Sequence, residues 1–275
     1  MALNKLALRP IKAAAYSDIG RRPNNEDAAS YSLEKSIIAG REMYRFIGVV
    51  ADGVGGRAKG EVASEIAVKH IKSYIQDQLA TSNGEFSNPA NIIITAYSIA
   101  NNKIIELSQS NPEFIGMATT ATTVVVQERS DSVELWVGHV GDSRAYMLML
   151  TRKKIILLTR DHTLIQEMIE KNQITPEEAM YHPYRSFITK ALGSSDWIPD
   201  FTIHRYTEPF LILICSDGLI HKLSMDEIYS NIIMKYDRNV GYTNILKSLC
   251  DKALERGEKD NITAILAGPF QLPIV

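Results

Sequence analysis

Four aspartates stand where apolar, β-branched runs of the sequence begin or end: Asp52, Asp142, Asp217 and Asp260. A fifth, Asp27, follows an Asn-Asn-Glu turn. Acidic residues at strand ends can meet at one edge of a sheet, where like charges repel and raise each other's pKa. A hard divalent cation removes that cost, because Mg²⁺ and Mn²⁺ prefer carboxylate, carbonyl and water oxygens. The pattern predicts a metal site. Taken singly, each aspartate could equally be a turn or capping residue, since Asp-Gly is a common turn dipeptide.

The segments between these aspartates predict an α+β domain, because helices cluster between runs of strands instead of alternating with them. Helical spacing of apolar residues appears over 61–79, after Pro89, near 224–233 and over 242–256. Strands are expected at 43–51, 201–206, 210–215 and 261–267. Four short β-rich runs at 118–127, 132–141, 143–150 and 153–159 suggest an antiparallel meander.

Composition and charge argue against a nucleic-acid-binding, membrane-spanning or exported protein. The chain has 275 residues, 45% of them hydrophobic, and a formal net charge of −2, so bulk charge favours neither nucleic acid nor a membrane surface as partner. The apolar stretch Leu6–Leu8 is too short for an export signal, and no run reaches the length of a membrane span. Cys215 and Cys250 are expected to be reduced core thiols. A cytoplasmic location is the prediction.

Nine ordered motifs together resemble the type 2C (metal-dependent, PPM-type) serine/threonine protein phosphatases in their compact bacterial form. The motifs are Arg22–Asp27, Val50–Gly56, Gly116–Thr120, Val140–Arg144, Asp161–Thr163, His182–Pro183, Ile188–Gly193, Cys215–Leu219 and Asp260–Thr263. One Asp-Gly-x-Gly-Gly motif alone would be weak support, but nine in order cover the chain from about residue 13 to 268.

The resemblance implies a four-layer α-β-β-α sandwich with two central, mainly antiparallel sheets. It implies a single catalytic domain over residues 1–275, with a flap at about 161–192. It also implies a ligand set for two Mn²⁺ or Mg²⁺ ions and a weaker third: Asp27, Asp52, the Gly53 carbonyl, Asp142, Asp217 and Asp260, with Glu26 acting through water. Asp52 corresponds to the carboxylate that bridges both metals, and Arg22 to the arginine that grips the substrate phosphate.

The implied reaction is hydrolysis of phosphoserine and phosphothreonine by a metal-bridging water. The implied partners are phosphorylated proteins, among them a cognate eukaryotic-like Ser/Thr kinase, and the chain is expected to be a monomer. Val54 stands where some relatives carry a histidine that could protonate the leaving alcohol, so the general acid is left open. Two alternatives also stay open: a catalytically silent phosphoprotein-binding or signal-sensing domain on this fold, and a small-molecule phosphatase.

Other motifs have simpler interpretations. The Cys250-x₅-Arg256 spacing matches cysteine-dependent phosphatases, but its interval contains no glycine and reads as helix, so we reject that chemistry. His162 and His182 are expected to anchor the flap. Thr119 and Thr120 are assigned packing roles, whereas Ser143 and Arg144 are expected to hold the Asp142 turn.

Overall fold

The computed structural model describes residues 10–38, 41–54, 59–81, 88–129, 131–179 and 181–271. Gly55 and Gly56 of the predicted metal motif lie outside these residues, as does the Leu6–Leu8 stretch.

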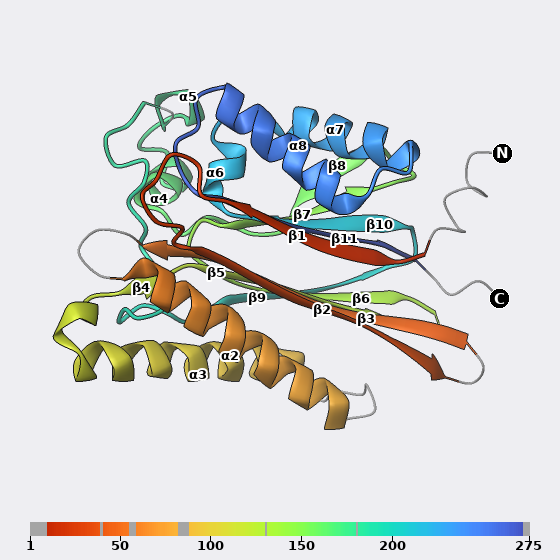
Figure 1. Ribbon diagram of the computed structural model, residues 1–275, viewed down its shortest axis with the longest axis horizontal. Coiled ribbons are helices and arrows are strands. Elements are labelled where there is room, and N and C mark those ends of the chain that lie inside the picture. The colour runs from red at the N-terminus through yellow and green to blue at the C-terminus, as the bar shows by residue number, and fades with distance from the viewer. Residues whose placement is uncertain are drawn as a thin grey trace.

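The strands form two antiparallel sheets (Figure 1). The five-stranded sheet has the order β1 (Lys12–Asp18), β11 (Ile262–Phe270), β10 (Phe210–Cys215), β7 (Arg144–Met149), β8 (Lys154–Leu157). The six-stranded sheet has the order β2 (Asp27–Ile38), β3 (Arg41–Val54), β5 (Ala121–Glu128), β6 (Val133–Val140), β9 (Asp200–Tyr206), and β4 (Ala118–Thr119) pairs with β3. The two sheets pack face to face on apolar side chains such as Phe46, Ile214 and Ile265.

Helices cover both outer faces and complete the four layers (Figure 1). The long helices α2 (Gly60–Thr81) and α3 (Pro89–Ser110) lie on the six-stranded sheet, while α7 (Met225–Asp237) and α8 (Tyr242–Glu255) lie on the other. Shorter helices are η1 (Pro112–Phe114), α4 (Leu164–Glu170), α5 (Pro176–Ala179) and α6 (Asp217–Ile220). The predicted α-β-β-α sandwich is confirmed.

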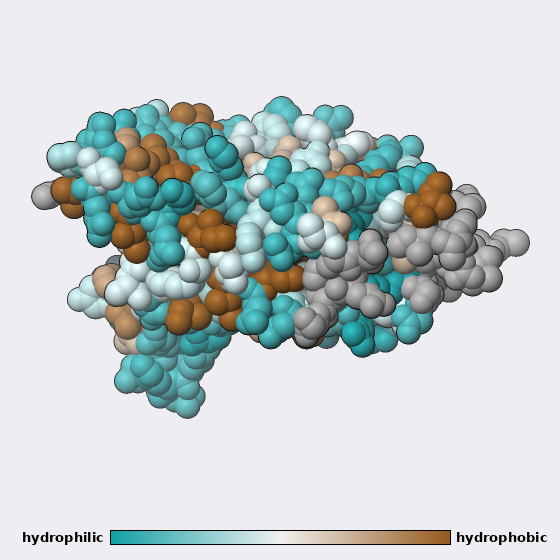
Figure 2. Space-filling view, turned by 90° about the horizontal axis from the view of Figure 1, so that it is seen from below, coloured by the Kyte–Doolittle hydropathy of each residue, from teal (hydrophilic) through white to brown (hydrophobic). Residues whose placement is uncertain are grey.

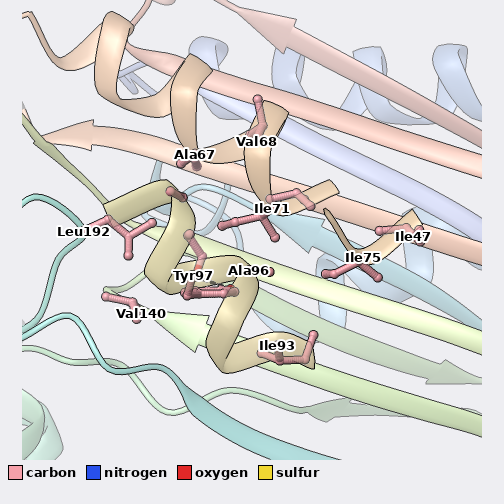
Figure 3. Packing of buried hydrophobic residues seen from close by; sticks show 14 of the residues in the cluster. Ile47, Ala67, Val68, Ile71, Ile75, Ile93, Ala96, Tyr97, Val140 and Leu192 are labelled. Atoms are coloured by element: carbon pink, nitrogen blue, oxygen red, sulfur yellow. Dashed lines mark hydrogen bonds between the residues drawn. The ribbon is translucent and has the colours of Figure 1, made fainter. Parts of the chain in front are cut away.

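The long helices sit where their apolar faces can be buried. Figure 3 shows Ile71 and Ile75 of α2 near Tyr97 and Ala96 of α3, in the cluster that packs these helices on the six-stranded sheet. The Tyr97 hydroxyl donates to the Gly138 carbonyl (2.8 Å), so this core tyrosine is satisfied although it is fully buried. The start of α2 lies against the end of β3, next to Asp52, because the backbones of Gly53 and Gly60 approach closely.

The predicted meander over 118–159 is wrong in one respect. β5 pairs with β6 and β7 pairs with β8, but β6 and β7 belong to different sheets. The chain crosses between the sheets at Gly141, whose φ of +103° suits glycine. Both β6 and β7 are buried, so their apolar runs fit a sandwich interior as well as they fit a meander. The crossing places Asp142 between the sheets.

The surface carries both hydrophilic and hydrophobic residues. Figure 2, which views the helix-covered side from below, shows a largely hydrophilic face with hydrophobic patches mainly on its left half. Cys215 and Cys250 are buried free thiols, as predicted. Within the described ranges, no helix has both the length and the apolarity that a bilayer span requires.

Candidate metal centre

Asp27 and Asp52 face each other across neighbouring strands. They are register partners in the antiparallel β2–β3 pair, which brings side chains on one face to roughly 5 Å of each other at Cβ. Burial, opposed by a hydrogen bond from Ser216 and reinforced by Asp217, raises the pKa of Asp27 to about 7. Burial and the charges of Asp27 and Asp217 likewise raise the pKa of Asp52 well above its ordinary value.

The backbone of Asp52 is held by the two threonines that the sequence assigned to packing. Thr120 Oγ1 accepts from the Asp52 N–H (2.9 Å), and Thr119 Oγ1 donates to the Asp52 carbonyl (2.9 Å). Both threonines are buried, so the packing role stands, but they also fix the position of Asp52. The next residue, Gly53, lies close to the backbone of Gly60: a Cβ on Gly53 would be 2.4 Å from it. Only glycine lets α2 begin this close to the metal motif.

Two further acids come from the other sheet. Asp217 follows β10 as the first residue of α6, and Asp260 precedes β11. Ser216 joins the two sheets here, since its hydroxyl donates to Asp27 Oδ2 (2.7 Å). Asn261 secures the neighbouring loop: its Oδ1 accepts from the Glu26 N–H (2.8 Å). Glu26 itself has a raised pKa, caused first by burial and then by Glu61.

Asp142 lies in the crossover turn. Burial, then the charges of Asp217 and Asp161, raise its pKa to about 8. Ser143 hydrogen bonds Thr120 (2.9 Å between hydroxyls) and Arg144 binds Asp161 through two nitrogens (2.8 and 2.6 Å). The expected support of this turn by Ser143 and Arg144 is therefore visible in their contacts.

The segment predicted as a flap begins beside that turn. His162 is buried and its backbone N–H donates to the Gly141 carbonyl (2.7 Å), while its Nδ1 accepts from the Gly141 N–H (3.1 Å). Its Nε2 lies 3.1 Å from an Asp200 oxygen. The contacts of His182, by contrast, are local: its ring accepts from the Tyr184 N–H (3.3 Å), and its backbone bonds Ala179 and Arg185 (3.2 Å each). His162 thus has the anchoring contacts expected of it.

The donor set suits a hard cation. Oxygen Oδ1 of Asp27, Asp142 and Asp217 is buried in each case and has no hydrogen-bond partner within the described part of the chain. Buried carboxylate oxygens without a donor are costly unless a cation meets them. Over the described ranges, however, no three His, Cys, Asp or Glu side chains are already arranged to hold a metal ion. Asp260 is instead bound to Arg22 (Nη2 to Oδ2, 2.6 Å).

Two residues next to these ligands were missed from the sequence. His221 lies one helical turn after Asp217, with Nε2 3.2 Å from its Oδ2, and Nδ1 lies 3.4 Å from Oε2 of the buried Glu258. These contacts raise the pKa of His221 to about 10. Burial opposes ionisation of Glu258, but His221 and backbone N–H groups outweigh it and lower its pKa to about 2. The i,i+4 spacing of Asp217 and His221 was the available signal.

The comparisons with known proteins all point to one family. A family model described as "Protein phosphatase 2C" matches residues 17–256. The chain is 32% identical to a "Putative protein phosphatase 2C-type" of Streptococcus pyogenes, covering 93% of this chain and 96% of that one. It is 30% identical to the serine/threonine protein phosphatase PstP of Mycobacterium tuberculosis, covering 94% of this chain but only 45% of the relative. This chain thus spans about half the length of that relative.

The fold also matches solved structures. The catalytic domain of PstP, crystallised in complex with two manganese ions, superposes with a TM-score of 0.71 at 27% identity. That match covers 94% of this chain and 97% of the PstP domain.

Proposed function

Because this chain belongs to the protein phosphatase 2C family, we propose that it is a serine/threonine protein phosphatase that depends on Mn²⁺ or Mg²⁺. One observation supports the proposal above the others. The pKa values of Asp27, Asp52 and Asp142 are raised, and a buried oxygen of Asp27, of Asp142 and of Asp217 meets no hydrogen-bond donor in the described chain. Such a cluster is a metal site or a defect of the fold, and the defect would be costly.

The residues that would hold the ions are those singled out in the sequence: Asp27, Asp52, the Gly53 carbonyl, Asp142, Asp217 and Asp260, with Glu26 nearby. When bound, a divalent pair lowers the pKa of water toward neutrality and neutralises charge on a phosphoryl group. The protein would hold these oxygens in place at the ends of strands from both sheets. Asp52 is fixed for that task by Thr119 and Thr120.

Arg22 has two possible partners. Here it binds Asp260, which raises the pKa of the guanidinium, and about half of its side-chain surface remains exposed. A guanidinium can bind two phosphate oxygens in one plane. Once Asp260 serves a cation, Arg22 is available to the phosphate of the substrate.

The substrates we infer are phosphoproteins, including a cognate eukaryotic-like Ser/Thr kinase whose autophosphorylation this chain would reverse. The support is the family alone, and release of phosphate from the autophosphorylated kinase tests it. We infer also that residues 1–275 act as one catalytic domain, that the chain is monomeric and that it works in the cytoplasm. Light scattering on the eluted protein and fractionation of cells test the last two inferences.

The decisive test is hydrolysis of an aryl phosphate and of a phosphothreonine peptide with Mn²⁺, with Mg²⁺ and with excess chelator. Asp217→Asn keeps the shape of the side chain and should lower kcat at least 100-fold, because it removes a charged ligand. Asp77→Asn is the matched control, since Asp77 is exposed near the far end of α2.

The outcomes separate the candidate functions. Metal-dependent release of phosphate from the peptide, lost in Asp217→Asn, supports a protein phosphatase. Activity on small phosphates alone would favour a small-molecule phosphatase. A folded wild-type protein inactive with every metal would favour the silent binding domain.

A further inference from the structure

The two oxygens of Asp217 have different surroundings. Oδ1 is buried and has no hydrogen-bond partner among the described residues, whereas Oδ2 lies 3.2 Å from His221 Nε2. The backbone sets this pair, because His221 ends α6 and its N–H donates to the Asp217 carbonyl (3.1 Å). One oxygen of this ligand is therefore occupied by the protein and the other is left open.

The second ring nitrogen of His221 continues the connection. Nδ1 lies 3.4 Å from Oε2 of Glu258, which is only 6% exposed. The other oxygen of Glu258, Oε1, accepts the backbone N–H groups of Lys259 (2.7 Å) and Asp260 (3.0 Å). A continuous path of polar contacts thus runs from the Asp217 carboxylate through His221 and Glu258 to the backbone of Asp260.

We propose that His221 and Glu258 are positioning residues that orient Asp217 and Asp260 together as metal ligands. The inference rests on the proposed function, since it presumes that both aspartates bind the ion. A free aspartate at the start of a short helix can rotate both oxygens toward solvent. The charge of Asp217 acts on both Asp142 and Asp27, so a contact that fixes Oδ2 limits how the carboxylate can turn beside them. Loss of such outer partners typically costs about 10–100-fold in metal affinity.

The competing view is that His221 merely adds an ion pair to the surface, where such pairs contribute little. Burial of Glu258 argues against it, because its Oε2 has no hydrogen-bond partner among the described residues and the His221 ring, 3.4 Å away, is the charged group that offsets it. The geometry also differs from a surface pair: one imidazole joins residues 41 positions apart, on the two turns that carry ligands.

The test measures Mn²⁺ binding directly, by titration calorimetry and by the electron paramagnetic resonance spectrum of the bound ion. The variants are His221→Ala, His221→Gln and Glu258→Gln. His221→Gln can still place an amide N–H near Asp217 Oδ2, and Glu258→Gln keeps an oxygen for the two backbone N–H groups. The control is His204→Ala, because His204 lies on β9 and bonds Thr202 instead of a predicted ligand.

We expect His221→Ala to weaken Mn²⁺ binding about 10–100-fold and to broaden the resonance spectrum, with His221→Gln recovering most of the affinity. Glu258→Gln should weaken binding less, and should add little in the His221→Ala background, because the two residues act as one unit. His204→Ala should match the wild type.

The inference is overturned if the wild type binds Mn²⁺ and His221→Ala binds it equally well. It is also overturned if His221→Gln is as weak as His221→Ala while melting at the wild-type temperature. A wild-type protein that binds no Mn²⁺ would instead refute the proposed function, so the two failures are distinguishable. Should His221→Ala not fold, Glu258→Gln, which keeps the shape of the glutamate, decides: wild-type Mn²⁺ affinity in that variant would overturn the inference.

Discussion

At the scale of single residues, burial of the clustered aspartates opposes their ionisation, and the described part of the chain does not fully offset this cost. Burial and mutual repulsion raise the pKa values of Asp27 and Asp142 to about 7 and 8, against ordinary values of 3.8. A carboxyl whose pKa is raised by folding stabilises the fold below its ordinary pKa, and that contribution disappears as the pH rises through the folded value. The metal-free protein should therefore be sensitive to alkali.

We expect the melting temperature of the chelator-treated protein to fall between pH 6.5 and 8.5. The pKa of His221 is raised from 6.5 to about 10, so its contribution to the stability of the fold also decreases as the pH rises across that window. Asp142→Asn should flatten the fall, because the neutral amide has no charge to desolvate. Differential scanning calorimetry at a series of pH values measures both effects, and a melting temperature that rises with pH would contradict the argument.

Arg22 gives a prediction about recognition. Arg22→Lys keeps the charge but loses the planar fork, so KM for a phosphothreonine peptide should rise about tenfold, or roughly 1.4 kcal/mol. Initial-rate kinetics at saturating Mn²⁺ measure the change. Arg21→Lys, on the exposed neighbour, is the control, and an unchanged KM in Arg22→Lys would remove Arg22 from the phosphate site.

Residue types alone predicted where the five aspartates lie in the fold. Each predicted aspartate does lie at a sheet end or in the crossover turn, because an acid that stops a buried strand is visible in the sequence. His221 and Glu258 were missed because their contacts depend on where α6 and the turn before β11 meet. The hydrogen bonds of Thr119 and Thr120 were missed for a related reason, since threonine in a strand already has an ordinary explanation.

At the scale of elements, close backbone approaches align the turns that carry the predicted ligands. A Cβ on Gly218 would lie 2.2 Å from the Asn261 carbonyl oxygen, so α6 touches the turn before β11 directly. Side chains of both turns also bond the start of β2: the Ser216 hydroxyl donates to the Asp27 carboxylate, and Asn261 Oδ1 accepts from the Glu26 backbone N–H. Separating α6 from this turn should disturb the centre even when every ligand is retained.

Gly218→Ala tests that coupling. We expect Mn²⁺ affinity to drop at least tenfold and the free energy of unfolding to fall by about 1–3 kcal/mol, as overpacking commonly costs. Calorimetric titration and chemical denaturation provide the two measurements. Gly241→Ala is the matched control, because a Cβ there meets nothing within 4 Å, and it should change neither quantity. Wild-type affinity in Gly218→Ala would show that α6 can shift without consequence.

The elements missed from the sequence are those with a weak pattern. β1 has the sequence KAAAYSD and β2 has DAASYSLEKSII, both rich in alanine, serine and charge. Each is an edge strand, so its identity depends on pairing with β11 or β3 more than on its own propensity. The division of β6 and β7 between sheets was missed because burial on both faces erases the alternation that would reveal it.

At the scale of the whole molecule, the proposed metal centre draws its ligands from both sheets. Asp27 and Asp52 belong to the six-stranded sheet, whereas Asp217 and Asp260 flank strands of the five-stranded sheet. An ion held by both pairs binds only the folded arrangement, so its binding free energy adds to the stability of the entire sandwich.

Mn²⁺ at about 100 times its Kd should therefore raise the free energy of unfolding by about 2.7 kcal/mol. Thermal melts with increasing Mn²⁺ measure this increase. The same titration on Asp52→Asn should show a much smaller shift, because one of the joining ligands has lost its charge. A shift of equal size in both proteins would place the stabilising ion elsewhere.

The pairing of the first and last described strands has a separate consequence. In the antiparallel β1–β11 register, Lys12 faces Gly268 and Asp18 faces Ile262, so the start of β1 and the end of β11 lie together, away from the ligand end. A short connection between them would form an ordinary β-hairpin. The fold is thus suited to circular permutation. A permuted chain would carry the same motifs in a different sequence order, while the aspartates kept their positions in space.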